Sequence, residues 1–323
     1  MKGLLISIGF MEYVDIISKE LTNILGETID TLEINTYSDG IGYFFNKFTG
    51  GKYDKIRDFN KQRNFFDSIE NEYYDYIVTI VGRGLNVNAF EKFLISQKHS
   101  IKILYMFDDV ARVEEFDNIA VFFDIIYSFD RVDCEKYGFK LLPLFYCDMY
   151  KYKAQHKNID FSCIGGLHSD REQFIKEIMN KYPKDKWKWK AVLVASSRFS
   201  IMKEYVFGKR TSTPDFISYH RIPMVRAADI MLRSKCTIDM PYPSQKGLTL
   251  RTIESLGART KLITTNKDII KYDFYNPNNI LVVDMSSNIT IPDDFISSPY
   301  ESISDSIVNK YSLNTWAHTI LGL

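Results

Sequence analysis

The sequence predicts an α/β protein made of two Rossmann-like domains that face a cleft, each built on a doubly wound parallel sheet. Short apolar runs alternate with helical patterns along the chain. These runs are apolar at successive positions, as in strands that helices cover on both faces. A polar stretch near the middle interrupts the alternation, and 323 residues suit two domains better than one.

The first half begins with an expected strand at residues 2–10, which ends near Gly9. Residues 11–25 are expected to form a helix because their apolar side chains recur at helical spacing. These side chains are Val14, Ile17, Leu21 and Leu25. The other strands expected in this half are 28–36, 74–82, 101–109, 123–130 and 140–146, and the other helices are 52–71 and 88–97.

The polar stretch 150–158, with the sequence YKYKAQHKN, is the predicted linker. It separates a first domain, residues 1–150, from a second domain, residues 151–305. Residues 306–323 are expected to form a C-terminal helix that packs back across the boundary. The strands expected in the second half are 158–166, 189–197, 236–240, 260–265 and 279–284, and the helices are 170–182, 224–234 and 248–258.

Composition excludes several classes of protein. Lysine plus arginine and aspartate plus glutamate both total 41, so the chain lacks the net basic charge of a general nucleic-acid binder. The four cysteines form no Cys-x-x-Cys pair, which argues against a zinc site or a disulfide framework and favours the cytoplasm. No apolar run is long enough to span a membrane, and acidic Glu12 and Asp15 follow the first apolar run, unlike a signal peptide.

The stretch 181–190 carries five lysines with Trp187 and Trp189 between them. We interpret it as a strand with one solvated face. The alternative is a contact with an anionic membrane surface.

Two loops of the second half follow expected strands and precede helices, where open parallel sheets bind ligands. In the loop 165–171, two glycines let a phosphate approach the backbone, Ser169 or Asp170 can cap the helix, and Arg171 supplies a positive charge. The alternative is an ordinary capping turn with a solvated arginine.

The segment 243–257 gives the more specific signal. Gly247 allows close approach to the backbone, and the amides of Leu248 and Thr249 lie where the next helix begins. The helix dipole and Lys246 both favour an anion there. Glu254, one to two turns further on, can accept two ribose hydroxyls if it faces the crevice, and is otherwise a solvated helix residue.

The order strand, Gly-Leu-Thr-x-Arg-x-x-Glu-Ser-Leu-Gly, strand, Thr-Asn resembles the donor-nucleotide segment of GT-B glycosyltransferases, particularly bacterial ones that build lipopolysaccharide or capsule. It is also similar to the glycosyltransferase-like domain of spore-maturation proteins. FSCIGGLHSDR resembles the start of the GT-B C-terminal domain, and SFDRVDCEKYGFKLLPLFY resembles the end of the N-terminal one. In retaining members a pair of glutamates eight positions apart frames this segment. The second glutamate of the pair corresponds to Glu254, but Lys246 occupies the position of the first glutamate. The resemblance therefore leaves open whether the enzyme retains or inverts the stereochemistry.

The resemblance implies a hexosyltransferase that moves a sugar from a nucleoside diphosphate to a glycan or lipid-linked acceptor, without a metal or other cofactor. UDP is the expected donor nucleotide because of its frequency in such enzymes. The enzyme is expected in the cytoplasm, with peripheral contact at the inner membrane surface as a further expectation.

The resemblance makes residues 1–150 the acceptor-side domain and residues 151–305 the nucleotide-sugar domain, and it also implies the donor contacts. Tyr219 would stack on the base, the backbone near Ile222 would read its edge, and Lys246 and Arg251 would neutralise the leaving diphosphate. The full set of expected donor-binding residues is His168, Arg171, Tyr219, Ile222, Gln245, Lys246, Gly247, Leu248, Thr249, Arg251 and Glu254.

On the acceptor side, the loops 9–12, 82–86 and 108–109 follow expected strands. If the enzyme inverts, a carboxylate must take the acceptor proton. Asp108 or Asp109 is the first candidate, with Glu12 behind them. The alternative is that the acidic pair caps a helix or pairs with Arg112. Arg83 either binds an anionic acceptor or is solvated.

Two rival functions use the same scaffold. A nicotinamide-dependent oxidoreductase needs Gly-x-Gly-x-x-Gly after the first strand, but Gly9 stands alone and Val87 occupies the third glycine position after Gly82 and Gly84. No Walker A sequence occurs either. A noncatalytic protein that binds a sugar or nucleotide stays open as the alternative.

Overall fold

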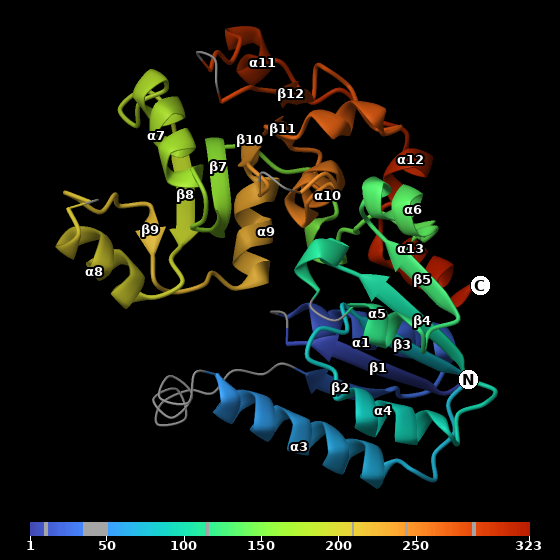
Figure 1. Cartoon of the computed structure of the whole chain (residues 1–323). Coiled ribbons are helices and arrows are strands. Elements are labelled where there is room, and N and C mark those ends of the chain that lie inside the picture. The colour runs from blue at the N-terminus through green and yellow to red at the C-terminus, as the bar shows by residue number, and fades with distance from the viewer. Residues whose placement is uncertain (10–11, 35–50, 114–115, 209, 243–244, 286–288) are drawn as a thin grey trace. The chain divides into compact units, whose positions relative to one another are not determined.

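The computed structural model describes the chain except for residues 10–11, 35–50, 114–115, 209, 243–244 and 286–288 (Figure 1). The chain divides into two compact units. Unit 1 is Met1–Pro143 together with Leu313–Leu323, and unit 2 is Leu144–Ser312. The predicted linker, residues 150–158, therefore lies inside unit 2, and the C-terminal segment belongs to unit 1.

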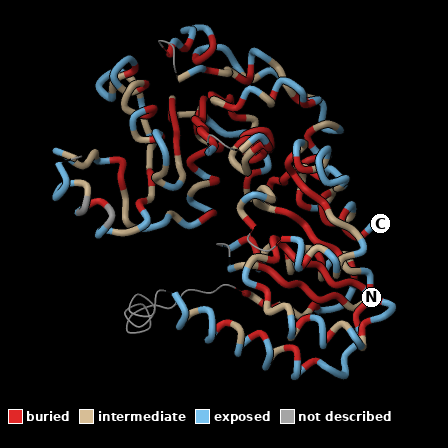
Figure 2. The backbone as a smooth tube through the Cα atoms, viewed as in Figure 1, coloured by how far each residue is buried: buried red, intermediate tan, exposed pale blue. Residues whose placement is uncertain are grey.

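Unit 1 contains a parallel sheet of six strands in the order β2-β1-β3-β4-β5-β6. Its strands are β1 (Gly3–Ile8), β2 (Asp30–Ile34), β3 (Tyr76–Ile80), β4 (Ile101–Met106), β5 (Ile125–Ser128) and β6 (Lys140–Leu141). Its α-helices are α1 (Tyr13–Leu25), α3 (Lys52–Ser68), α4 (Val87–Leu94), α5 (Phe116–Ala120), α6 (Arg131–Tyr137) and α13 (Leu313–Leu321). The strands are mostly buried, as expected for a sheet with helices on both faces (Figure 2).

Two of these helices show how the sequence pattern becomes packing. The four apolar residues predicted to form one face of α1 are all buried, and Gly26 ends the helix in the left-handed conformation. The C-terminal helix α13 packs against α1. Its Trp316 is buried edge-on against Tyr105 of β4, with ring centroids 4.9 Å apart.

Unit 2 contains a second parallel sheet of six strands, in the order β12-β11-β10-β7-β8-β9. Its strands are β7 (Ile159–Gly166), β8 (Trp189–Val194), β9 (Ile217–Ser218), β10 (Ser234–Asp239), β11 (Lys261–Thr264) and β12 (Ile280–Val282). Its α-helices are α7 (Arg171–Lys181), α8 (Arg198–Val206), α9 (Met224–Leu232), α10 (Leu250–Gly257), α11 (Asp293–Ser297) and α12 (Asp305–Asn309). Two parallel sheets with flanking helices confirm the predicted fold class.

Some elements differ from the expectation for physical reasons. The last strand of unit 1 stops at Leu141, because Pro143 cannot donate a ladder hydrogen bond. The single helix expected at 306–323 is two helices, α12 and α13, because Ser312 between them forms a bridge with Tyr146.

Helix α8 and strand β9 were not predicted. Ile201 of α8 is buried, but Phe199, Met202 and Val206 are exposed, so the helix lacks a continuous buried apolar stripe that a sequence pattern would reveal. Strand β9 has only two residues, too few to show a periodicity.

The lysine- and tryptophan-rich stretch packs on the sheet of unit 2. Trp189 stacks on Phe161 at 4.6 Å between ring centroids, Trp187 lies 5.7 Å from the same ring, and Lys184 pairs with Asp215. The strand itself, β8, begins only at Trp189, and residues 182–188 connect α7 to it, so the predicted strand with one solvated face is confirmed only for the last two residues of the stretch. Across the described residues, the helices are all too short or too polar to cross a membrane.

Candidate functional site

The candidate site lies where the strand order of unit 2 reverses. From β7 the chain continues to β8 and β9 on one side, whereas β10, β11 and β12 lie on the other, and β7 and β10 are neighbours. Ligands of open α/β sheets bind at the carboxyl ends of the strands at such a switch point. The loops after β7 and β10 are the two segments from which the sequence predicted donor contacts.

Arg171 joins these two loops. As the first residue of α7 it turns back over the sheet, and its terminal nitrogens donate to the carbonyl of Gly166 at 2.9 Å and to the carbonyl of Met240. The side chain is buried, and its Nε has no hydrogen-bond acceptor in the described structure. Arg171 is thus a positively charged clamp across the switch point.

Gly165 leaves room for two guanidinium groups. A Cβ at this position would lie 2.5 Å from Nη1 of Arg171 and 4.0 Å from Nη1 of Arg251. Both arginines therefore lie beside one glycine at the end of β7. Two like charges this close favour an anion as a third partner.

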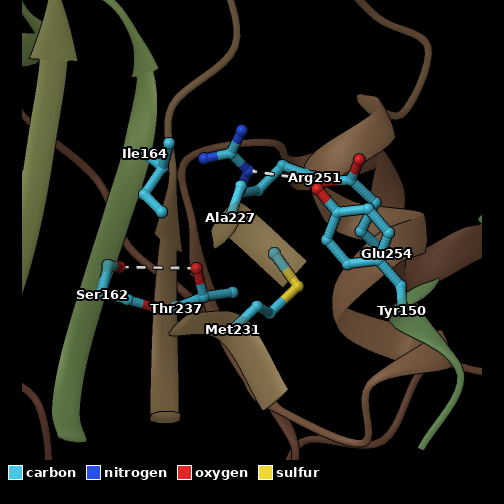
Figure 3. Close-up of a pocket in the computed structure, with 8 residues that line it drawn as sticks. All are labelled: Tyr150, Ser162, Ile164, Ala227, Met231, Thr237, Arg251 and Glu254. Atoms are coloured by element: carbon cyan, nitrogen blue, oxygen red, sulfur yellow. Dashed lines mark hydrogen bonds and ion pairs between the residues drawn. The ribbon is translucent and has the colours of Figure 1, made fainter. Parts of the chain in front are cut away.

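Arg251, the second residue of α10, has a guanidinium that forms an ion pair but no hydrogen bond within the described structure. Its Nε is buried without a hydrogen bond and lies 3.8 Å from Glu254, and no hydrogen bond of its terminal nitrogens to a described residue is found. Figure 3 shows these nitrogens directed toward Ile164 at the end of β7 and away from Tyr150. Burial opposes the charge, but Glu254 and Asp239 hold the pKa of Arg251 above its ordinary value. The group is therefore a permanent cation with donors to spare.

The N-terminus of α10 is pre-formed. Thr249 caps the helix by accepting from the amide of Thr252 at 3.2 Å, and its hydroxyl donates to buried Asp239 at 2.6 Å. The side-chain amide of Asn266 donates to the carbonyls of Lys246 and Gly247. Strand β10, helix α10 and the loop after β11 thus fix residues 246–257 of the segment that the sequence singled out, whereas residues 243–244 lie outside the described residues.

Within this segment, the predicted residues divide into buried and exposed ones. Gly247 and Leu248 are buried, Gln245 donates to the carbonyl of Gly247 at 3.2 Å, and the Lys246 side chain is exposed. Lys246 can therefore move toward a bound anion.

Glu254 is 3% exposed and lies beside a small cavity in the described part of unit 2 (Figure 3). The residues that line the cavity are Tyr150, Ser162, Ile164, Ala227, Met231, Thr237, Arg251 and Glu254. Its volume is about 10 Å³ for the centre of a water-sized sphere, which is room for one water molecule and too little for a ribose. In this structure Glu254 forms an ion pair with Arg251 and lines the cavity together with Tyr150, and its role toward a ribose stays a prediction.

The remaining predicted donor contacts lie in loops at the same carboxyl edge. His168 stacks on Tyr242, with ring centroids 3.7 Å apart. Tyr219 is half-buried against the core of unit 2, and the guanidinium of Arg198 lies 5.3 Å over its ring. Ile222 is half-buried. One face of the Tyr219 ring thus already has a cationic partner.

In unit 1 the predicted carboxylates have arginine partners. Asp108 pairs with Arg83 at 4.0 Å, and Asp109 pairs with Arg112 at 3.2 Å. Burial raises the pKa of Asp109, and Arg112 only partly offsets this effect. Glu12 is exposed at the start of α1. Phe10 and Met11 of the same loop lie outside the described residues.

Sequence reasoning missed three residues of this site. Asp239 ends β10, and an acid at the carboxyl end of an apolar strand is a signal that could have found it. Tyr242 follows the same strand. Tyr150 belongs to the polar stretch taken as a linker, and nothing in its sequence context indicates that it is buried. Among the described residues, no group of three or more histidine, cysteine, aspartate or glutamate side chains is arranged to hold a metal ion.

Fold and site together define a Rossmann-like α/β protein of two units, with two arginines at the switch point of the second. No protein-family model and no curated protein matches the sequence. Solved structures match over the full chain, among them the lipopolysaccharide outer core galactosyltransferase WaaB (11% identity, 98% of that chain covered, TM-score 0.52). Another is HepE of Anabaena in complex with UDP and glucose (10% identity, 98% covered, TM-score 0.58). A third is the UDP-GlcNAc 2-epimerase of Methanocaldococcus jannaschii in complex with UDP-GlcNAc and UDP (11% identity, 99% covered, TM-score 0.54). The chain has the GT-B fold.

Proposed function

We propose that this protein is a glycosyltransferase that transfers a sugar from a nucleoside diphosphate, with UDP as the expected nucleotide, to a glycan or lipid-linked acceptor. The observation that carries the proposal is the guanidinium of Arg251, which lies beside Gly165 at the switch point of unit 2 and makes no hydrogen bond to a described residue. The fold shared with WaaB, and with HepE in its complex with UDP and glucose, supports it. The likeness to lipopolysaccharide, capsule and spore-maturation enzymes, the cytoplasmic location and the contact with a membrane surface belong to the same proposal.

In the proposed reaction, the acceptor oxygen forms a bond to C1 of the sugar while the bond between C1 and the diphosphate oxygen breaks. Arg251, the N-terminus of α10 and the exposed Lys246 side chain would stabilise the charge that develops on the diphosphate, without a metal. A carboxylate of unit 1 would take the acceptor proton. Asp109 is the first candidate, because its raised pKa makes it a stronger base than an ordinary aspartate, with Asp108 and Glu12 behind it.

Nucleotide binding tests the donor site. Thermal melts with UDP, GDP, CDP, CMP, TDP and NAD identify the base, and a ligand at about 100 times its dissociation constant stabilises the folded state by roughly 2.7 kcal/mol. Calorimetry then compares Arg251→Gln with Arg259→Gln at the opposite end of α10. Arg259 pairs with Asp305, so its loss removes the same charge without touching the switch point. A hydrogen bond to a charged group contributes about 1.5–3 kcal/mol, so we expect Arg251→Gln to weaken UDP binding at least about tenfold and Arg259→Gln to leave it within twofold.

Turnover separates transfer from the alternatives. Slow release of UDP from a UDP-sugar in the absence of acceptor supports a transferase. Binding without release of UDP indicates a noncatalytic protein, and conversion of UDP-GlcNAc to an epimer indicates an epimerase. A melt that responds to NAD alone, or equal losses of UDP binding in the two arginine variants, would overturn the proposal.

A further inference from the structure

Helix α8 presents apolar side chains on the outside of unit 2. It connects β8 to the edge strand β9 (Figure 1). Its exposed residues Phe199, Met202 and Val206 are three and four positions apart, so they share one side of the helix, and exposed Phe207 follows directly. We call these four residues the apolar face of α8. Large apolar side chains that gather on a surface in this way mark an interaction site.

The opposite side of α8 is fixed to unit 2. Ile201 is buried in the core, and Glu204 pairs at 2.6 Å with Arg210, whose side chain is largely buried. Arg210 also pairs with Glu172 of α7. Gly208, in the left-handed conformation, lets the chain turn back so that the amide of Arg210 donates to the carbonyl of Glu204 at 3.1 Å. The helix cannot roll inward without breaking these contacts, so a cover for the apolar face must come from outside.

The helix carries a positive charge. Between residues 198 and 210 the sequence has a single acid, Glu204, and its charge is compensated by Arg210. The other basic residues of this stretch are Arg198, Lys203 and Lys209. The apolar face is therefore bordered by basic residues without a compensating acid in the same stretch.

The loop after β9 adds to this charge. Arg198, the first residue of α8, lies 5.3 Å over the ring of Tyr219 in that loop, and Arg221 two residues further on is exposed. Residues 217–226 contain no acid, and neither arginine forms an ion pair within the described residues. Apolar side chains with cations beside them complement a bilayer surface, which offers acyl chains beneath anionic headgroups.

We propose that α8 docks this protein on an anionic lipid bilayer: the apolar face enters the headgroup region, while Arg198 and Arg221 contact lipid phosphates. This inference rests on the proposed function only for its purpose, which is to bring the donor site to a lipid-linked acceptor. The stretch 181–190 is less suited to the same contact, because Trp187 and Trp189 pack on Phe161 of the sheet.

The test is co-sedimentation of the full chain with vesicles of phosphatidylcholine alone, or of phosphatidylcholine and phosphatidylglycerol in equal parts. Val206→Ser/Phe207→Ser alters the apolar face, and Tyr73→Ser/Val121→Ser is the matched control in unit 1. Val206 and Val121 are both 77% exposed, and Phe207 and Tyr73 are 70% and 73% exposed. Because all four side chains are exposed, we expect both variants to fold and to melt close to the wild type.

We expect the wild type to bind the mixed vesicles at least about tenfold more tightly than phosphatidylcholine, since each cation at an anionic surface contributes about fivefold. Arg198→Gln/Arg221→Gln should remove most of this preference. Val206→Ser/Phe207→Ser should weaken binding to the mixed vesicles about tenfold, because less apolar area is buried, and the control should stay within twofold.

Three results would overturn the inference. The first is a wild type that does not bind the mixed vesicles, or that loses affinity equally in the two serine variants. The second is a dimer in ultracentrifugation without vesicles that Val206→Ser/Phe207→Ser dissociates, because a second copy would then cover the apolar face. The third is a loss of binding in Lys186→Gln/Lys188→Gln but not in the variants of α8, which would place the contact on the stretch 181–190.

Vesicle binding needs no nucleotide, so the two proposals can fail separately. A protein that binds UDP but no vesicles keeps the proposed transfer reaction and loses the docking role of α8. A protein that binds vesicles through α8 but binds no nucleotide keeps the docking role and loses the proposed function.

Discussion

Gly165→Ala should disable the clamp at the switch point, whereas Gly166→Ala should be nearly silent. A Cβ at residue 165 would lie 2.5 Å from Nη1 of Arg171, closer than such atoms approach, so the guanidinium must move. A Cβ at residue 166 would meet its nearest neighbour, a ring carbon of His168, at an ordinary 3.8 Å. The two neighbouring substitutions thus differ in one steric contact.

The magnitude follows from the bonds that Arg171 makes. Its guanidinium donates to the carbonyls of Gly166 and Met240, and a hydrogen bond of a charged group contributes about 1.5–3 kcal/mol. The change from glycine to alanine also stabilises the folded state by about 0.4–1 kcal/mol, because it lowers the conformational entropy of the unfolded chain. Loss of both bonds therefore leaves a net cost of about 2 kcal/mol or more. In a domain of this size that lowers the melting temperature by roughly 4–8 °C.

The assay is a melt and a urea titration of both variants, with UDP affinity measured in parallel. We expect Gly165→Ala to lose stability and nucleotide affinity together, since Nη1 of Arg251 lies beside the same glycine. If Gly165→Ala stayed within about 0.5 kcal/mol of Gly166→Ala, the inferred packing of the arginines against β7 would be wrong.

Three further predictions concern packing and ionisation. Gly257→Ala brings a Cβ to 2.6 Å from the buried ring of Tyr146, and the urea midpoint should fall because overpacking costs about 1–3 kcal/mol. An unchanged midpoint would contradict the packing of Tyr146 against Gly257. Burial lowers the pKa of Lys157, whose Nζ donates to Leu232, Ser234 and Thr260, from 10.5 to about 8. The unfolded chain therefore binds one more proton than the folded chain between about pH 8 and 10.5. Over this range the free energy of unfolding of the wild type, measured in urea titrations, should rise by up to about 3 kcal/mol relative to that of Lys157→Met. If the two proteins showed the same dependence on pH, the lowered pKa of Lys157 would be refuted. Burial raises the pKa of Asp109, so the folded state binds that proton more tightly than the unfolded chain, and stability should fall as the pH rises through the raised value. Asp109→Asn should reduce this dependence of stability on pH, whereas an unaltered dependence would mean that other groups cause it.

The sequence predicted the fold well, because fold depends on patterns that extend over many residues. Continuous apolar runs such as β1 and β3 are buried on both faces, and the apolar stripe of α1 lies in the core. What escaped prediction was local. The two-residue strand β9 shows no period, and α8 exposes most of its apolar side chains.

The candidate site was predictable only in outline, because a motif names residues and not their partners. The segment from Gly247 to Gly257 led to Arg251, Thr249 and Glu254, which the structure brings together on α10 and its cap. It gave no sign that Glu254 faces Tyr150, which lies far from it in the sequence within a polar stretch. Contacts between distant segments follow from the topology of unit 2, and no pattern within either segment contains them.

Arg171 and Arg251 lie at the same site but have different roles. A guanidinium has five N–H donors, and those of Arg171 reach the carbonyls of Gly166 and Met240, so this side chain ties the loops after β7 and β10 together. Arg251 begins on α10 and approaches the same glycine from the other side of the switch point, with Glu254 near its Nε and its terminal nitrogens uncommitted. The hydrogen bonds of Arg171 hold the loops of the site together, whereas the terminal N–H donors of Arg251 stay available for a ligand. An anion that enters here would complete the hydrogen bonding of Arg251 without breaking any bond of Arg171, and for that reason the site can bind and release it while the loops remain in place.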